Sequence, residues 1–200
     1  MDEDNGRRAQ ILRAAFEEFA AHGFSGATIK GIARAAGLQS QALIYWYFPT
    51  KEALFRAVIE AQVPYLQDAA AGQALLDRPP EEVLPLLARG YLAIAHQPFA
   101  GRVVRLLIPE VLRRPEVADL MGPLIEQRVL GFLRTYLDRQ VALGRLRPHD
   151  TRSSARMFLG TFLVQALGIV ALPALRADGL EDDQHVESGV ALFLEGLRPR

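Results

Sequence analysis

The chain has 200 residues, enough for one or two small domains that bury a hydrophobic core of their own. Half of the residues are hydrophobic and 23% are charged, which argues against an intrinsically disordered chain. The absence of cysteine excludes disulfides, a thiol nucleophile and cysteine-ligated metal sites, while 23 basic and 23 acidic residues cancel, so a nucleic-acid partner must be judged from where the charges lie.

Apolar residues recur with a helical period along most of the chain, and an all-α fold is therefore expected. The first predicted helix has an apolar stripe made of Ile11, Ala15, Phe16 and Phe19. Gly23 is a suitable stop for this helix. Thr28 is a favourable N-cap for a second, short helix that Gly37 ends, and Ser40 can cap a third helix that Pro49 closes.

Longer helices are expected after Thr50, which can cap a helix from Lys51 to about residue 71. The pattern then predicts a helix over residues 81–96 and another near residues 100–112. Pro115 is expected to open a further short helix.

The Gly122-Pro123 pair should break the helical pattern, with the proline at the first position of the next helix. Gly144 is expected to stop that helix, and Asp150 to cap the following one. The acidic residues 181–183 suit the N-terminal end of the last helix, where the helix dipole favours negative charge.

Residues 1–50 are expected to form a helix-turn-helix domain, because the second and third helices are short and joined by a glycine turn. In such a motif the later helix lies in the major groove of DNA, and its N-terminal residues face base edges. Residues 20–51 contain no acidic side chain and have a local charge of +3. The basic residues of this window are Lys30, Arg34 and Lys51. This window suits a polyanion although the net charge of the chain is zero.

Two stretches within the first quarter of the chain resemble a known family. They read Ile11-Leu12-x-Ala14-Ala15-x-x-x-Phe19-x-x-x-Gly23-x-x-x-x-Thr28-x-x-x-Ile32-Ala33-x-x-Ala36-Gly37 and Leu43-Ile44-Tyr45-Trp46-Tyr47-Phe48-Pro49-x-Lys51-Glu52-x-Leu54-Phe55. At this spacing they resemble the N-terminal domain of the TetR family of transcriptional regulators. The segment from Gly37 to Phe48 is one residue longer than the usual pattern, which leaves open which residue begins the recognition helix, the helix that Ser40 is expected to cap.

The candidates for base readout are Ser40, Gln41 and Ala42, because they head the recognition helix. Gln41 could pair with adenine in the major groove, and Ala42 could touch a thymine methyl group. Leu43 and Phe48 are expected to belong to the core of the domain.

The candidates for contacts with the DNA backbone flank the recognition helix. Thr28 would cap the second helix and present its N–H groups to a phosphate, while Lys30 and Lys51 would reach phosphates directly. The resemblance implies that the positions of Tyr45, Trp46 and Tyr47 also touch DNA, chiefly its backbone. An aromatic cluster of this kind is more often core, but three consecutive helical residues cannot all face inward.

Residues 51–200 are expected to form a larger helical domain that binds a ligand and dimerises. Dimerisation is expected because one recognition helix reads only a few base pairs, whereas two on a two-fold axis read half-sites about 34 Å apart. The uncharged segment 157–175 is the first candidate for self-association, and the last helix is the second. The alternative is that segment 157–175 is the central core of one subunit.

Segment 157–175 is also close to the length of a membrane span. Thr161 and Gln165 interrupt it, Pro173 lies near its end, and the N-terminal sequence lacks the pattern of a secretory signal. We therefore expect a cytoplasmic protein without a membrane partner. A membrane-anchored regulator is the alternative that recovery in a detergent-free soluble fraction would exclude.

The TetR resemblance implies a ligand cavity in the larger domain. The candidate lining residues are Tyr91, Arg102, Leu106, Phe132, Tyr136, Phe162 and Gln165. Each is more often an ordinary core or surface residue than a ligand contact. Arg102 and Arg105 would suit an anionic ligand. Ligand binding would favour a conformation with wrongly spaced recognition helices, and the helix beginning at Lys51 would act as the lever.

Enzymatic function is not expected, because the four histidines are scattered and neither a phosphate-binding glycine loop nor a nucleophile elbow occurs. No metal or cofactor is expected either. The sequence predicts a ligand-responsive DNA-binding regulator, a repressor that a small effector releases from a palindromic operator as a homodimer. The alternative is an all-α small-molecule binding protein whose DNA binding is weak or lost.

Overall fold

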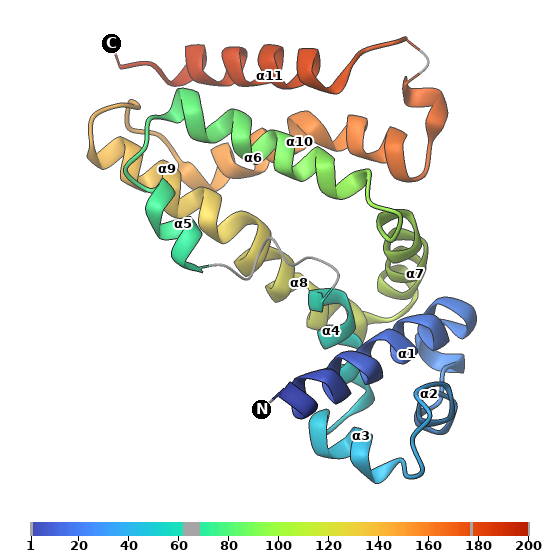
Figure 1. Ribbon diagram of the computed structural model, residues 1–200. Coiled ribbons are helices and arrows are strands. Elements are labelled where there is room, and N and C mark those ends of the chain that lie inside the picture. The colour runs from blue at the N-terminus through green and yellow to red at the C-terminus, as the bar shows by residue number, and fades with distance from the viewer. Residues whose placement is uncertain (1, 62–68, 177, 200) are drawn as a thin grey trace. The chain divides into compact units, whose positions relative to one another are not determined.

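The computed structural model describes residues 2–61, 69–176 and 178–199 (Figure 1). Throughout these residues the regular structure is helical and no strand occurs, which confirms the expected all-α fold. The α-helices are α1 (Asp2–Gly26), α2 (Ile29–Ala35), α3 (Ala42–Tyr47), α4 (Lys51–Ala61), α5 (Ala69–Leu75), α6 (Pro80–Ala95), α7 (Ala100–Arg113), α8 (Pro115–Ile125), α9 (Gly131–Ala142), α10 (Thr151–Val170) and α11 (Asp182–Leu197). A π-helical turn (Glu126–Leu130) precedes α9, and a 3₁₀ turn (Pro173–Arg176) follows α10.

The helices form two compact units. Unit 1 takes its residues from Met1–Pro64 and Arg102–Pro123. Unit 2 takes its residues from Tyr65–Gly101 and Leu124–Arg200. The assignment of separate functions to residues 1–50 and 51–200 remains a prediction.

The helix boundaries of unit 1 follow from local capping chemistry. Gly23 has φ 68°, which interrupts the regular helical geometry of α1 at the predicted stop. The Thr28 hydroxyl accepts from the Gly31 N–H at 2.9 Å and caps α2, as expected. The Thr50 hydroxyl accepts from the Ala53 N–H at 3.0 Å at the start of α4, which also agrees with the prediction.

The core of unit 1 is built around three phenyl rings from α1, its C-terminal turn and α4. Phe19 meets Phe55 edge-on with ring centres 5.0 Å apart, and Phe24 meets Phe55 edge-on at 5.1 Å. All four residues of the predicted α1 stripe are buried, so this helix presents the expected face to the core. Burial of each isoleucine or phenylalanine side chain in this core contributes roughly 1.5–3 kcal/mol, which anchors the short helices of the motif.

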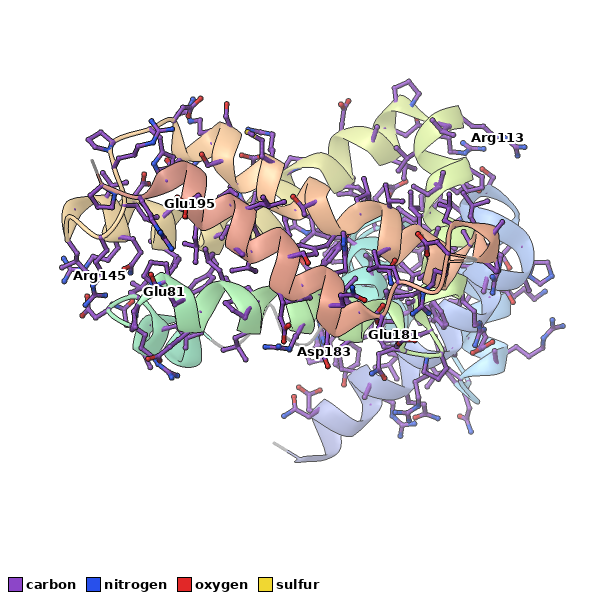
Figure 2. All side chains as sticks on the ribbon, turned by 90° about the horizontal axis from the view of Figure 1, so that it is seen from above. Glu81, Arg113, Arg145, Glu181, Asp183 and Glu195 are labelled. Atoms are coloured by element: carbon purple, nitrogen blue, oxygen red, sulfur yellow. The ribbon has the colours of Figure 1, made fainter. Side chains whose placement is uncertain are left out.

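Unit 2 packs α6, α10 and α11 against one another, with α9 on α10 (Figure 1). Its core includes Tyr136, Phe158 and Phe162, all essentially inaccessible. Figure 2 shows Glu181 and Asp183 at the N-terminal end of α11, where the predicted acidic residues favour the helix dipole. Gly144 (φ 70°) ends the segment after α9, and Asp150 Oδ1 accepts from the Arg152 N–H at 3.0 Å to cap α10, both as predicted.

One predicted helix boundary differs from the structure, and another lies outside the described residues. The break at Gly122-Pro123 was wrong, because α8 runs through both residues to Ile125. Pro123 has no N–H to donate to the Asp119 carbonyl, four residues earlier in the helix. Asp119, Gly122 and Pro123 are all exposed, so water can hydrate this carbonyl instead. The helix expected over residues 51–71 begins at Lys51, and α4 extends to Ala61, but residues 62–68 lie outside the described part of the chain.

Among the residues that the structure describes, one helix, α10, is long and apolar enough to cross a membrane by length and composition. A buried core helix satisfies the same criterion. Phe158, Phe162 and Ala166 lie on one face of α10 and are buried in the core of unit 2. This burial favours the interpretation as a core or interface helix over a membrane span.

Candidate nucleic-acid interface

The turn between α2 and α3 has the geometry of a helix-turn-helix. Gly37 has φ 63°, a conformation that glycine adopts readily, and ends α2 as predicted. Its N–H bonds to the Arg34 carbonyl at 3.0 Å, and the next N–H, from Leu38, bonds to the Ala33 carbonyl at 2.9 Å. These two bonds satisfy the last carbonyls of α2 and fix the direction in which the chain leaves it.

The structure gives a start for the recognition helix, which the sequence left open. Gln41 already has helical dihedrals (φ −66°, ψ −26°), although the regular helix α3 is assigned from Ala42. The Ser40 hydroxyl accepts from the Ala42 N–H at 3.1 Å, but the prediction that Ser40 caps this helix was wrong, because Gln41 is the N-cap residue and its carbonyl accepts from the Ile44 N–H at 3.0 Å. The longer segment after Gly37 therefore leaves Ser40, Gln41 and Ala42 at the head of the helix.

The exposed face of α3 carries the predicted readout residues. Gln41 and Ala42 are exposed, as are Tyr45 (49%) and Trp46 (70%), whereas Ile44 is fully buried. The prediction that Phe48 belongs to the core is confirmed, but the same prediction for Leu43 was wrong, since its side chain is 36% exposed. Positions three or four residues apart share a helix face, so the buried Ile44 and Phe48 mark the inward side, and Leu43, next to Ile44, faces away from it.

Tyr47 has a protein partner. Its hydroxyl donates a hydrogen bond to Asp4 Oδ1 on α1, and this bond raises the pKa of the Tyr47 phenol. The Trp46 ring meets the Tyr47 ring edge-on, with centres 4.6 Å apart. A carboxylate oxygen thus occupies the place at Tyr47 where a DNA phosphate oxygen would accept the same hydrogen bond.

The candidate phosphate contacts differ in how firmly they are held. Lys30 is exposed on α2. Lys51 Nζ donates to the Ser25 carbonyl at 3.3 Å and lies 4.9 Å from the centre of the Phe24 ring. Partial burial lowers the pKa of Lys51. The Thr28 hydroxyl is occupied as the cap of α2, so its predicted role at DNA depends on the backbone rather than on this group.

Gly31 was not singled out from the sequence, although it lies in the middle of α2. A Cβ atom there would collide with the carboxylate of Glu18 on α1. The signal was a glycine inside a helix, which often marks a close approach. Glu18 also accepts weakly from the Thr28 N–H at 3.5 Å, so it helps to join α1 to the start of α2.

Five of the predicted ligand-cavity residues lie in unit 2. Tyr136 is buried, and its hydroxyl donates to the Arg78 carbonyl at 2.9 Å. Gln165 is buried and donates to the Leu180 carbonyl at 3.1 Å and to Asp182 Oδ1 at 2.6 Å. Phe162 is fully buried, and burial raises the pKa of Tyr91. Phe132 stacks on Tyr136, with ring centres 6.3 Å apart.

The other two cavity candidates belong to unit 1. The Arg102 guanidinium pairs with Glu17 on α1 and lies 4.6 Å from the centre of the Phe16 ring. Leu106, one turn later on α7, is buried. The single cavity predicted from all seven residues therefore stays a prediction.

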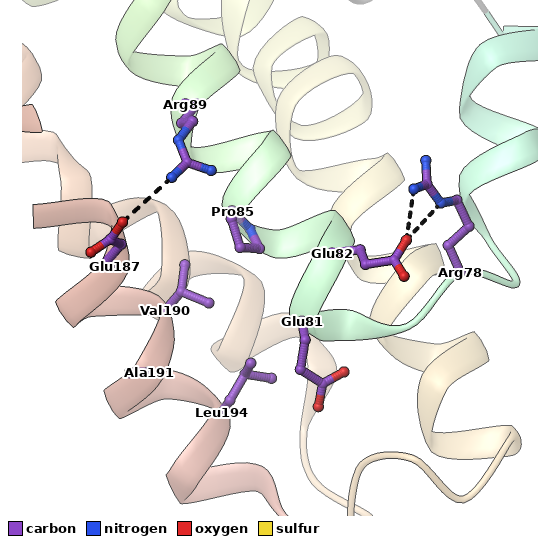
Figure 3. Close-up of a pocket in the computed structure, with 9 residues that line it drawn as sticks. All are labelled: Arg78, Glu81, Glu82, Pro85, Arg89, Glu187, Val190, Ala191 and Leu194. Atoms are coloured by element: carbon purple, nitrogen blue, oxygen red, sulfur yellow. Dashed lines mark hydrogen bonds and ion pairs between the residues drawn. The ribbon is translucent and has the colours of Figure 1, made fainter. Parts of the chain in front are cut away.

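A surface pocket of about 550 Å³ lies between α6 and α11 in unit 2 (Figure 3). It contains none of the seven candidates. Its lining residues are Arg78, Glu81, Glu82, Pro85, Arg89, Glu187, Val190, Ala191 and Leu194. Ion pairs occupy both ends, since Arg78 pairs with Glu82 at 2.6 Å and Arg89 with Glu187 at 3.9 Å.

Comparisons with known proteins agree with this architecture. Residues 11–58 match the profile of "Bacterial regulatory proteins, tetR family", and residues 82–196 match that of "AefR-like transcriptional repressor, C-terminal domain". The HTH-type transcriptional regulator RutR of Escherichia coli (strain K12) is 29% identical over 209 residues, which cover 98% of this chain and 92% of RutR.

Two solved structures show the same fold over nearly their whole length. The flavonoid-responsive regulator FrrA is 31% identical, with a TM-score of 0.71, over 98% of this chain and 99% of FrrA. GusR of Salmonella enterica is 22% identical, with a TM-score of 0.68, over 95% of this chain and 96% of GusR. The exposed helix α3 and these matches lead to one conclusion: the chain belongs to the TetR family of ligand-responsive, DNA-binding transcriptional regulators.

Proposed function

We propose that this chain acts in the cytoplasm as a homodimeric repressor on a palindromic operator, from which a small molecule releases it. The observation that carries the proposal is the start and exposed face of α3, where Gln41, Ala42 and Trp46 are exposed on a short helix without acidic neighbours in sequence. The matched C-terminal profile, which describes a transcriptional repressor, supports repression rather than activation.

Base readout is assigned to the first turn of α3. Gln41 offers an amide that can pair with adenine, and the Ala42 methyl group can pack on thymine. Tyr45 and Trp46 project from the same exposed helix and would donate to backbone phosphates, as would Lys30. Gln41 and Ala42 therefore set the sequence preference, while the phosphate contacts set affinity.

Dimerisation is assigned to the apolar surface of α10 and α11. The exposed large apolar side chains there are Met157, Leu163, Val164 and Leu172 in and just after α10, and Leu192 on α11. Gly160 lies on the same exposed side with open space where a Cβ would be, so a partner helix could approach closely. A soluble regulator that leaves this much apolar surface uncovered would gain stability by pairing with a second copy.

Effector binding is assigned to the interior of unit 2. Tyr136 and Phe162 are fully buried, so a ligand there would select a more open arrangement of this core. Such selection is the population shift by which effector and operator would oppose each other. FrrA is named for its response to flavonoids, which makes planar aromatic compounds a sensible first class to screen.

The proposal is tested by gel shift with the DNA upstream of the chain's own gene at moderate salt. Retention of a palindromic fragment, with two chains per fragment, is the expected result. Gln41→Ala should change the preference at one base position in each half-site. Ligand binding without retention of any fragment would instead identify a small-molecule binding protein.

A further inference from the structure

Part of the chain far from the N-terminus belongs to the DNA-binding unit. Residues 82–196 match a C-terminal family profile, yet Arg102–Pro123 fold with residues 1–64 as unit 1. This segment contains most of α7 and nearly all of α8. The contacts of α7 with α1 therefore lie inside unit 1 and can fix the geometry of the DNA-reading helices.

The first of these contacts is a partly buried carboxylate on a backbone amide. Glu110 Oε1 on α7 accepts from the Phe24 N–H at 3.0 Å, and its side chain is only 14% exposed. Phe24 follows Gly23, whose positive φ removes its neighbour from the regular hydrogen-bonding pattern of α1. A Cβ atom at Gly23 would lie 2.7 Å from the same oxygen, so the glycine also makes room for this carboxylate.

The turn that Glu110 holds leads directly to the motif that meets DNA. The Phe24 ring packs edge-on against Phe55 at 5.1 Å, and Lys51 Nζ bonds to the Ser25 carbonyl. Three residues later Thr28 caps α2. A shift of this turn would therefore move the start of α2 and the Lys51 ammonium together.

A second contact attaches α7 to α1 two turns earlier. The Arg102 guanidinium pairs with Glu17 and lies over the Phe16 ring at 4.6 Å. Eight helical residues separate Arg102 from Glu110, about 12 Å along α7. Two attachment points along one helix fix its direction as well as its position against α1.

We propose that Glu110 is a positioning residue for operator recognition: it sets the placement of α2 and α3 by holding the Gly23–Phe24 turn to α7. This inference rests on the proposed function, because it concerns how well the DNA-reading helices are placed. Glu110 itself is not a DNA contact, since its oxygens are bonded to Phe24 and to Arg114 Nε at 2.9 Å.

The chain offers matched variants that separate the contacts of Glu110. Glu110→Ala removes the acceptor for the Phe24 N–H. Glu110→Gln keeps a side-chain oxygen that can accept this bond but loses the charge that pairs with Arg114. Arg114→Ala removes the same ion pair and leaves the Glu110 carboxylate in place.

The test measures binding to the operator fragment retained by the wild type and to a fragment with one altered half-site. For Glu110→Ala the ratio of the two affinities should fall about tenfold, a change of the size expected when a partly buried charged hydrogen bond is lost, while Glu110→Gln and Arg114→Ala keep it within about threefold. A merely structural role would lower the folded fraction and weaken both fragments equally, leaving the ratio unchanged. The Phe24 amide should exchange with solvent faster only in Glu110→Ala.

An unchanged ratio in Glu110→Ala, or an equal loss in Glu110→Gln, would overturn the inference while leaving the proposed function intact. Failure of the wild type to retain any DNA fragment would instead overturn the proposed function, and the inference with it.

Discussion

Replacing Lys51 separates two roles that the structure gives to one side chain. Its ammonium bonds to the Ser25 carbonyl and lies over the Phe24 ring, which stabilises the end of α1. The same charge is a candidate phosphate contact at the start of α4. Lys51→Gln retains a donor for the carbonyl and removes the charge, whereas Lys51→Ala removes both.

The two variants should differ in stability. Loss of the hydrogen bond costs about 1 kcal/mol, and loss of a partly exposed cation–π contact costs about 0.5–1 kcal/mol. Lys51→Ala should therefore lose roughly 1.5–2 kcal/mol of unfolding free energy, which lowers Tm by about 3–8 °C for a chain of this size. Lys51→Gln should lose about half as much, because it keeps the hydrogen bond.

The two variants should agree in their DNA binding. Removing one phosphate contact lowers the slope of log K against log salt by about 0.9, so the affinity lost between 50 and 200 mM salt should shrink by about 3.5-fold in both. Fluorescence anisotropy with a labelled operator measures this slope, and thermal unfolding measures Tm. An unchanged slope in Lys51→Gln would refute the phosphate role, and an unchanged Tm in Lys51→Ala would refute the structural one.

Three further predictions concern other parts of the chain. Asp4→Ala should raise DNA affinity severalfold, because it frees the Tyr47 hydroxyl and removes a charge that repels phosphate. Anisotropy should measure a smaller gain when Asp4→Ala is made in a Tyr47→Phe background, where there is no hydroxyl to free. Val164→Arg, at a 56% exposed position of α10, should yield a folded monomer by light scattering, whereas Gln73→Arg on the exposed side of α5 should leave a dimer; a dimeric Val164→Arg would disprove the assigned interface. Although partial burial opposes its ionisation, hydrogen bonds from His96 and Gln165 hold the pKa of Asp182 below its usual value, so its contribution to stability should be present above about pH 4 and lost as the pH falls through the lowered pKa; urea unfolding of Asp182→Asn should lack this loss.

The parts of the fold that were predictable from the sequence depend on local chemistry. Thr28 and Thr50 cap helices because a hydroxyl and the N–H group it accepts from lie within three residues of each other. Gly37 ends α2 because the residue after a helix often needs a positive φ. Neighbouring residues carry all of this information.

The parts that escaped prediction depend on contacts between distant residues. Glu110 meets the Phe24 amide across 86 positions, and Tyr47 meets Asp4 across 43, so no local spacing signals either bond. Leu43 was misplaced because the inward face of a six-residue helix is set by what α3 packs on. The distribution of charge was more informative than its zero sum, since the acid-free window 20–51 contains the exposed recognition helix.

The central claim is that α3 reads a palindromic operator in pairs. Selection of binding sites from a random DNA pool by the purified full-length chain tests this claim most directly. For the wild type we expect an enriched palindrome with half-site centres about 34 Å apart. For Gln41→Ala we expect a changed base preference at one position of each half-site. Enrichment of no sequence, or of the same sequence by Gln41→Ala as by the wild type, would contradict it.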